Sequence, residues 1–199
     1  MSDIAFRPAT AFLDTSRIAS GPLAIVALAV KAALVTNPEA AIIVFEDQTG
    51  KVVDLDLRGS DAEIAARYAP PAVAAQESTD DAPRGRGRPK LGVVAREVTL
   101  LPRHWDWLAL QPGGASQALR RLIDEARKAD GGRSRTRAAQ ERAYAFIATM
   151  AGDREGFEEA SRALFAGDDA RFAEHSRTWP ADIRAHAAKL LANDHVADS

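Results

Sequence analysis

The sequence predicts an α+β protein that is mostly helical, and three observations lead to this class. Hydrophobic residues make up 46% of the 199 residues but aromatic residues only 6%, a balance that favours helices packed through small side chains such as alanine. β-rich runs that alternate in polarity are concentrated in the first third of the chain, as expected for a small sheet. Apolar residues at helical spacing dominate the rest of the sequence.

The first part, residues 1–68, is expected to form an acidic α+β module. Its predicted elements are strands at 10–13 and 17–20, a helix from 21 to about 35, and a hairpin of strands at 41–45 and 51–57. Pro22 suits the beginning of the helix because proline is tolerated in the first helical turn. Ser60 and Glu63 have the spacing of a capping box, which predicts a short helix ending near Tyr68.

The last part, residues 133–199, is expected to form an acidic helical module. Its predicted helices lie at about 133–151, 154–165, 168–176 and 180–192. Gly152, Gly167 and Trp179-Pro180 separate these helices, since glycine and proline interrupt helical patterns. Residues 69–93 are predicted to be a linker and a basic arm, because the linker part is rich in small and polar residues and has no periodicity.

Charge is distributed unevenly along the chain. There are 6 Lys and Arg against 12 Asp and Glu in residues 1–81, 14 against 6 in residues 82–142, and 6 against 10 in residues 143–199. A basic central block therefore lies between two acidic blocks, although the net charge of the whole chain is −2. Such asymmetry indicates a segment that binds a polyanion. The alternative is that the blocks neutralise one another within the fold.

The basic arm contains the stretch PRGRGRPKLG, residues 83–92. Its four cations are Arg84, Arg86, Arg88 and Lys90. Glycine removes bulk where a backbone approaches a surface closely, and proline holds the chain extended. Residues 84–90 resemble an AT-hook, a short peptide that lies in the narrow, negative minor groove of A·T-rich DNA, which attracts arginine. The resemblance implies that these cations bind double-stranded DNA; the alternative is a solvated linker.

The segment after the arm has a strand–helix–helix order. A strand is predicted at 96–101, Pro102 suits the beginning of a first helix, and Ser116 is expected to cap a second helix after the break at 112–114. Over residues 94–128, with Leu101-Pro102 and Leu122-Ile123 in matching places, this order resembles the ribbon-helix-helix family of bacterial repressors. The unit predicted from it spans residues 94–129.

The resemblance implies a homodimer that binds DNA. Two copies of the strand would pair antiparallel, because one strand alone cannot satisfy its backbone hydrogen bonds, and the paired strands would enter the major groove. The free N–H groups at the beginning of the second helix would bind a phosphate. The residues expected to contact DNA in this unit are Arg96, Thr99, Arg103, Ser116 and Arg120.

The strand departs from the family's pattern. In the family's phase its outward residues are Arg96, Val98 and Leu100, and in the opposite phase they are Glu97, Thr99 and Leu101. Neither set suits base reading, because the first is largely apolar and the second carries a carboxylate that repels phosphate. We therefore expect the strand to serve dimerisation and the arm to supply most of the DNA affinity.

Little in the sequence supports catalysis or a bound cofactor. The chain has no cysteine, which excludes disulfides, zinc–thiolate sites and cysteine nucleophiles. Its four histidines have no metal-ligand spacing. Asp54 and Asp56 share one face of a predicted strand, where a solvated surface is expected rather than a cation site. We expect no enzymatic activity, no cofactor and no metal.

No contact with a membrane is predicted. The most apolar segment, residues 22–35, is shorter than the roughly 20 apolar residues that cross a bilayer, and Lys31 interrupts it. The first residues lack the basic region and apolar run of a signal peptide. A cytoplasmic location is therefore expected.

The whole chain resembles an uncharacterised bacterial domain-of-unknown-function family, through the stretches RGRPKLGVVAREVTLLPRHWDWL and QPGGAS. The resemblance implies that the three parts belong together, and it brings no activity. The predicted function is that of a DNA-binding protein, either a transcriptional regulator or a nucleoid-associated factor. The alternative is a non-enzymatic interaction module whose basic arm docks on an acidic protein and whose repressor-like unit is only a dimerisation core.

Overall fold

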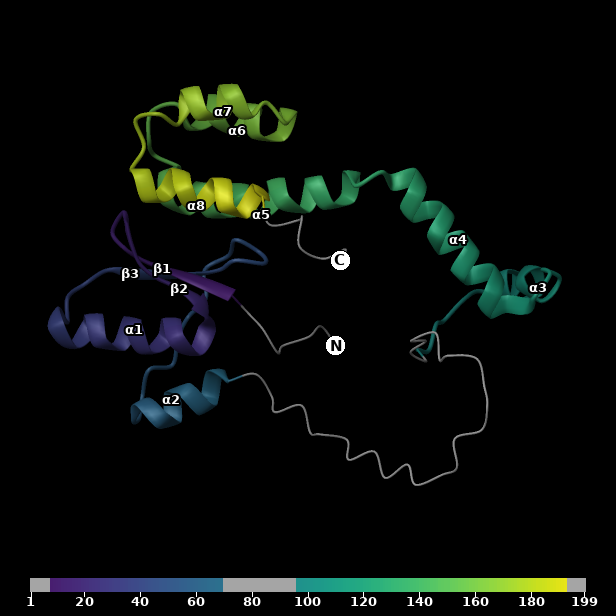
Figure 1. The fold of residues 1–199 in the computed structure, drawn as a ribbon, viewed down its shortest axis with the longest axis horizontal. Helices are drawn as coiled ribbons and strands as arrows, with labels where there is room; N and C mark the ends of the chain where they lie inside the picture. Colours follow the sequence, from purple (N-terminus) through teal and green to yellow (C-terminus); the bar gives the residue numbers. More distant parts are fainter. Residues whose placement is uncertain (1–7, 70–95, 193–199) are drawn as a thin grey trace, which may run out of the picture. The chain divides into compact units, whose positions relative to one another are not determined.

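The computed structural model describes residues 8–69 and 96–192. The chain divides into two compact units, which we call unit 1 (residues 1–73 and 133–199) and unit 2 (residues 74–132). The described residues form a mixed α+β protein that is mostly helical, with eight helices and one three-stranded antiparallel sheet (Figure 1). The predicted fold class is confirmed at this level.

The sheet of unit 1 is built from the first part of the chain. Its strands are β1 (Pro8–Leu13), β2 (Ser16–Pro22) and β3 (Ile42–Glu46), in the order β2-β1-β3. Asp14 makes the β1–β2 turn with φ of 52°, a left-handed conformation that aspartate tolerates better than most residues. Helix α1 (Leu23–Thr36) follows with Pro22 as its N-cap. These elements confirm the strands predicted at 10–13, 17–20 and 41–45 and the helix predicted from 21.

The strand predicted at 51–57 is wrong beyond its beginning. The first residues pair with β3 through the bridge between Phe45 and Val52, with hydrogen bonds from the Glu46 N–H to the Lys51 carbonyl at 3.0 Å and from the Val53 N–H to the Val44 carbonyl at 2.8 Å. Beyond it, the backbone of Asp56 pairs with side chains of the next helix: its N–H donates to the Tyr68 hydroxyl, and its carbonyl accepts from Arg67 Nη1 at 2.7 Å. Because these groups bind side chains, no sheet partner is needed.

Helix α2 (Asp61–Tyr68) begins with the predicted capping box. Ser60 Oγ accepts from the Glu63 N–H at 3.3 Å, and Glu63 Oε2 accepts from the Ser60 N–H at 2.7 Å. The hydrogen bonds to Ser60 lower the pKa of the Glu63 carboxyl, because they stabilise its charged form.

The second half of unit 1 is helical, as predicted. Its helices are α5 (Arg133–Ala151), α6 (Phe157–Ala166), α7 (Asp169–His175) and α8 (Ala181–Ala192). Gly156 precedes α6 and Gly167 follows it, both with positive φ. The side chain of Asp168 caps α7 by accepting from the Arg171 N–H at 3.0 Å.

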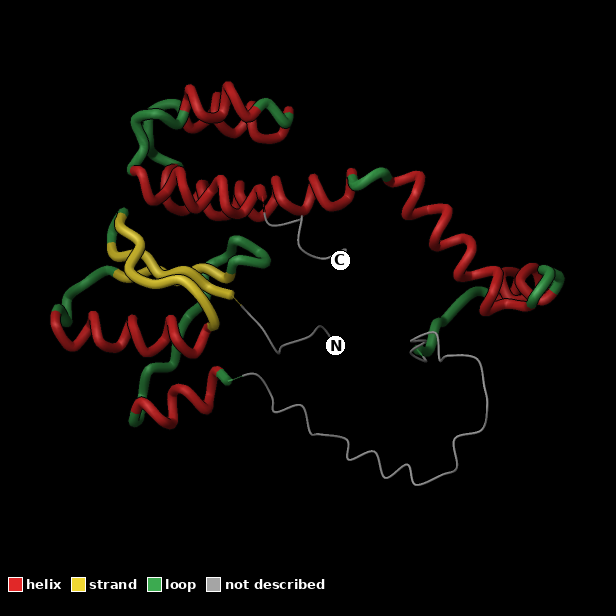
Figure 2. The backbone as a smooth tube through the Cα atoms, viewed as in Figure 1, coloured by secondary structure: helices red, strands yellow, loops and turns green. Residues whose placement is uncertain are grey.

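In unit 1 the sheet lies between α1 and the pair α5 and α8, and α6 and α7 lie on the side of that pair away from the sheet (Figure 2). Alternation along β1 explains this, because successive side chains of a strand point to opposite faces. Ala9 and Ala11 pack in the cluster that includes Val26 and Val30 of α1. Phe12 instead joins the larger cluster of α5, α6, α7 and α8.

The two ends of the described chain therefore share one core. Phe12 and Phe45 of the sheet lie with their ring centroids 5.4 and 4.8 Å from that of Phe146 on α5. The sequence suggested separate modules at residues 1–68 and 133–199, whereas the structure places both in unit 1. The physical reason is that the apolar face of a three-stranded sheet must be covered, and α5 and α8 cover it.

Candidate functional site

Unit 2 is described from residue 96 and contains two helices. Helix α3 (Pro102–Ala109) begins with its proline in the first turn, and α4 (Gly114–Asp130) ends at Gly131. Gly113 is the N-cap of α4, with φ of 81° and no side-chain cap. The prediction that Ser116 caps this helix is wrong, because the two left-handed glycines Gly113 and Gly114 begin the helix earlier.

The predicted strand at 96–101 is not formed within the single chain. Residues 96–101 have no regular secondary structure. Leu101 is extended, with φ of −66° and ψ of 149°. None of the strands in the described part of the chain pairs with this segment. An isolated strand is not expected to form, because its backbone groups need a partner strand.

Unit 2 exposes most of its large apolar side chains. Only Leu108 and Ala118 belong to its buried hydrophobic residues in the part that the structure describes. The exposed set consists of Val98, Leu101, Trp105, Trp107, Leu110, Leu122 and Ile123. Contiguous exposed apolar surface marks interaction sites in soluble proteins. Unit 2 therefore presents a surface that two short helices cannot bury by themselves.

The predicted DNA-binding residues of unit 2 are all accessible. They are Arg96, Thr99, Arg103, Ser116 and Arg120. Arg96, Arg103 and Arg120 make no ion pair or hydrogen bond with another described side chain, whereas Arg121 lies 3.9 Å from Glu125. Arg84, Arg86, Arg88 and Lys90 lie outside the described residues.

Sequence reasoning missed a polar cluster between the sheet and α8 of unit 1. It joins Thr10 of β1, Ser20 of β2, Asp47 after β3, and His186 and Lys189 of α8. These residues are far apart in sequence, and no local pattern links them. One signal was available: Asp47 directly follows an apolar strand, a place where a buried carboxylate can lie.

Asp47 is the centre of this cluster and is 2% exposed. Its Oδ2 accepts from Lys189 Nζ at 2.7 Å, and its Oδ1 accepts from the Thr10 hydroxyl at 2.9 Å. Lys189 Nζ also donates to Ser20 Oγ at 3.0 Å. The Ser20 hydroxyl, 3.0 Å from that of Thr10, can then donate to it. Such charge-assisted hydrogen bonds compensate the cost of burying a carboxylate.

His186 lies beside Asp47 and has a different environment. It is fully buried, and its ring centroid is 4.6 Å from that of Phe146 and 5.4 Å from that of Phe12. Neither ring nitrogen has a hydrogen-bond partner among the described residues, and Nε2 is 3.6 Å from Asp47 Oδ1. Burial lowers the pKa of this imidazole to about 4, with Asp47 opposing the shift and Lys189 and Arg17 adding to it.

The sequence predicts a solvated surface at Asp54 and Asp56. In the structure, two arginine side chains pair with Asp56. Arg58 Nε lies 2.8 Å from Asp56 Oδ1, and Arg67 Nη1 lies 3.8 Å from it. The hydrogen bonds from Arg58 hold the pKa of the Asp56 carboxyl below its usual range. No group of three or more His, Asp or Glu side chains in the described ranges is arranged to hold a metal ion.

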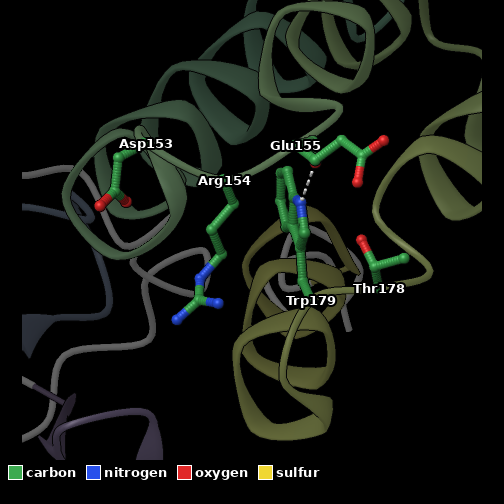
Figure 3. Close-up of a pocket in the computed structure, with 5 residues that line it drawn as sticks. All are labelled: Asp153, Arg154, Glu155, Thr178 and Trp179. Carbon is green, nitrogen blue, oxygen red and sulfur yellow. Dashed lines mark hydrogen bonds between the residues drawn. The ribbon is translucent and has the colours of Figure 1, made fainter.

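An open depression of about 380 Å³ lies between the α5–α6 connection and the beginning of α8 (Figure 3). Its lining residues are Asp153, Arg154, Glu155, Thr178 and Trp179. The indole N–H of Trp179 donates to the Glu155 carbonyl at 2.9 Å. This depression is open and largely polar, unlike the apolar clefts that hold small molecules. Among the described helices, none has the length and apolar character to cross a membrane.

The fold and these sites define a mixed α+β protein with a helical unit that exposes apolar side chains. A family model described as an uncharacterized protein conserved in bacteria (DUF2239) matches residues 8–191. The chain therefore belongs to this family, as its stretches RGRPKLGVVAREVTLLPRHWDWL and QPGGAS suggested. Searches of curated proteins and of solved structures found no match to the chain.

Proposed function

We propose that the protein binds double-stranded DNA as a homodimer, as a transcriptional regulator or a nucleoid-associated factor. In this proposal unit 2 supplies the dimer contact, and the basic arm supplies most of the affinity through Arg84, Arg86, Arg88 and Lys90. Binding rather than catalysis is the activity.

The exposed apolar surface of unit 2 is the observation that carries the proposal. Leu110 is 82% exposed and Ile123 57% exposed. Fully burying a large apolar side chain contributes roughly 1.5–3 kcal/mol, so covering this surface with the same surface of a second chain is favourable. A second copy would also supply a partner for the backbone groups of residues 96–101.

The cations of unit 2 support DNA as the ligand. Arg96, Arg103 and Arg120 are exposed, and no carboxylate of the described residues neutralises them. The first turn of α4 contains no acidic residue. A helix N-terminus carries partial positive charge, which favours a phosphate there.

Fluorescence anisotropy tests DNA binding. Labelled A·T-rich and G·C-rich duplexes are titrated with the protein at two salt concentrations. The double variant Arg86→Ala/Arg88→Ala should bind more weakly, with the slope of log K against log[salt] reduced by about 2, since each phosphate contact contributes roughly 0.9. The control, Arg162→Ala/Arg171→Ala, removes the same charge from exposed ion pairs of unit 1. Equal slopes for wild type and both variants would exclude the arm as the DNA contact.

Sedimentation velocity tests the dimer separately. Ile123→Glu should shift the protein towards monomer because it buries a carboxylate in the contact. Ile25→Glu is the matched control, since Ile25 on α1 is 59% exposed. A wild-type chain that stays monomeric at high concentration would exclude unit 2 as a dimer contact.

The second candidate is an interaction module that uses unit 2 only for dimerisation. The exposed Val98 and Leu101, together with the adjacent Glu97, favour it, because an apolar and acidic segment suits a protein partner better than a base edge. Limited proteolysis separates the two candidates. An arm protected without DNA favours the interaction module, whereas protection that appears only with DNA favours DNA binding.

A further inference from the structure

The polar cluster at Asp47 connects helix α8 to the sheet of unit 1. Lys189 of α8 binds the Asp47 carboxylate and the Ser20 hydroxyl, as described above. A second contact joins the same elements: the backbone N–H of Arg17 in β2 donates to Asp182 Oδ2 at 2.8 Å. α8 is thus attached to the sheet by polar contacts on one side and by the buried Ile183, Ala187 and Leu190 on the other.

His186 lies inside this attachment and has no polar partner of its own. The charged groups that act on its imidazole are the Asp47 carboxylate after β3, which lies 3.6 Å away, and, through their positive charge, Lys189 of α8 and Arg17 of β2. Helix α5 and strand β1 contribute the rings of Phe146 and Phe12. In this position the imidazole is cut off from water, so its charged form is unfavourable while α8 is in place.

We propose that α8 is a proton-linked latch: when α8 opens away from the sheet, His186 becomes exposed and takes up a proton, so that acidification favours the open form. In the closed form the His186 imidazole is neutral and buried, and in the open form it is exposed to solvent. Opening would uncover the part of the sheet face beside Phe12 that α8 covers, while α5 still covers the rest.

The size of the effect follows from proton linkage. An exposed imidazole has a pKa of about 6.5, whereas burial lowers the pKa of His186 to about 4. Between pH 7.5 and 5.5 the closed form stays neutral and the open form becomes protonated. The opening equilibrium constant should therefore rise about tenfold over this range.

A buried thiol measures the opening. The chain has no cysteine, so the full-length variant Ala187→Cys has a single thiol at a fully buried site of α8. Its rate of labelling by a disulfide reagent is divided by the rate in denaturant at the same pH. This ratio should rise about tenfold from pH 7.5 to 5.5. Adding His186→Phe should make the ratio independent of pH, because phenylalanine has a similar shape, does not titrate and removes no hydrogen bond.

Two controls keep the proposal open to refutation. Ala27→Cys places the thiol in α1, also fully buried, and its ratio should not follow that of α8. A second replacement, His186→Gln, tests the same loss of pH dependence should the phenylalanine variant fold poorly. The proposal is overturned by a ratio that does not change with pH, by a rise that persists without His186, or by an equal rise at position 27.

Discussion

Gly50 occupies a place in unit 1 that no other residue fits. Its φ is +68°, and a Cβ there would lie 1.9 Å from the carbonyl oxygen of Arg142 on α5. This glycine therefore sets how closely the turn after β3 approaches α5, because the obstacle is backbone and cannot rotate away. The Nε of Arg142 donates to the Leu190 carbonyl of α8 at 2.7 Å, so the same residue joins all three elements.

Gly50→Ala should destabilise unit 1 more than Gly167→Ala. Gly167 has the same φ, but the nearest atom to its Cβ would be Gln140 Nε2 at 4.0 Å, so this control isolates the left-handed conformation, which costs roughly 1–2 kcal/mol. Steric overlap at Gly50 should add about 1–3 kcal/mol. Urea unfolding measures both free energies of unfolding. Equal losses would show that the turn moves away from α5 at no cost.

At the scale of single residues, the burial of Asp47 is a feature that the sequence does not predict. Its position in a turn was predictable, because Asp47-Gln-Thr-Gly50 has turn composition. Its burial was not, since the partners Lys189 and His186 lie about 140 residues further along the chain. The residues predicted to bind DNA were chosen from local charge and motif instead, and those that are described are indeed at the surface.

At the scale of elements, local chemistry correctly predicted where several helices begin, although the Ser116 cap was wrong. The Ser60–Glu63 capping box and the proline-initiated helices α1 and α3 depend on neighbours within a few residues. Among the predicted strands, those at 10–13, 17–20 and 41–45 were confirmed and most of the one at 51–57 was wrong, whereas the strand at 96–101 is expected to pair with a second copy and the single chain does not test it. Strand formation depends on a partner that polarity alternation does not identify, and residues 51–57 found side chains of α2 instead.

Ser60→Ala should destabilise α2 by about 1 kcal/mol, because Ser60 Oγ accepts from the Glu63 N–H. Hydrogen exchange of the α2 amides, together with urea unfolding, measures this loss. Ser116→Ala is the informative control. It should cost less than about 0.5 kcal/mol in α4, since Gly113 is the N-cap there. If Ser116→Ala lowered the free energy of unfolding as much as Ser60→Ala, Ser116 would be shown to cap α4.

At the scale of the whole molecule, unit 1 is discontinuous in sequence. The sheet with α1 and α2 comes from one end of the chain, the helices α5 to α8 come from the other, and unit 2 is inserted between them. Charge changes after residues 81 and 142, and the glycines at 131 and 132 interrupt the helical pattern at the boundary between the two units. These features carried no information about which segments share a core, because that depends on the faces of β1 and β3.

A fragment of residues 1–81 should fail to fold alone, because the face of the sheet that carries Phe12 and Phe45 would lie bare. We expect no cooperative thermal transition by circular dichroism. Mixing it with a fragment of residues 133–199 should restore a transition, since the two fragments together contain the whole core. A cooperative transition of the first fragment by itself would show that α1 is sufficient to stabilise the sheet.

The discontinuous core also has a consequence for biosynthesis. β3 ends at Glu46, but the last core residue of α8 is Leu190, so at about 5–20 residues per second the nascent sheet waits roughly 7–30 s for its cover. During that interval Phe12 and Phe45 face the cytosol of the translating cell, and unpaired sheet edges and bare aromatic surface are what chaperones bind. Slow translation of the middle of the chain would lengthen the exposure, so the yield of folded protein should depend on how quickly residues 70–132 are synthesised.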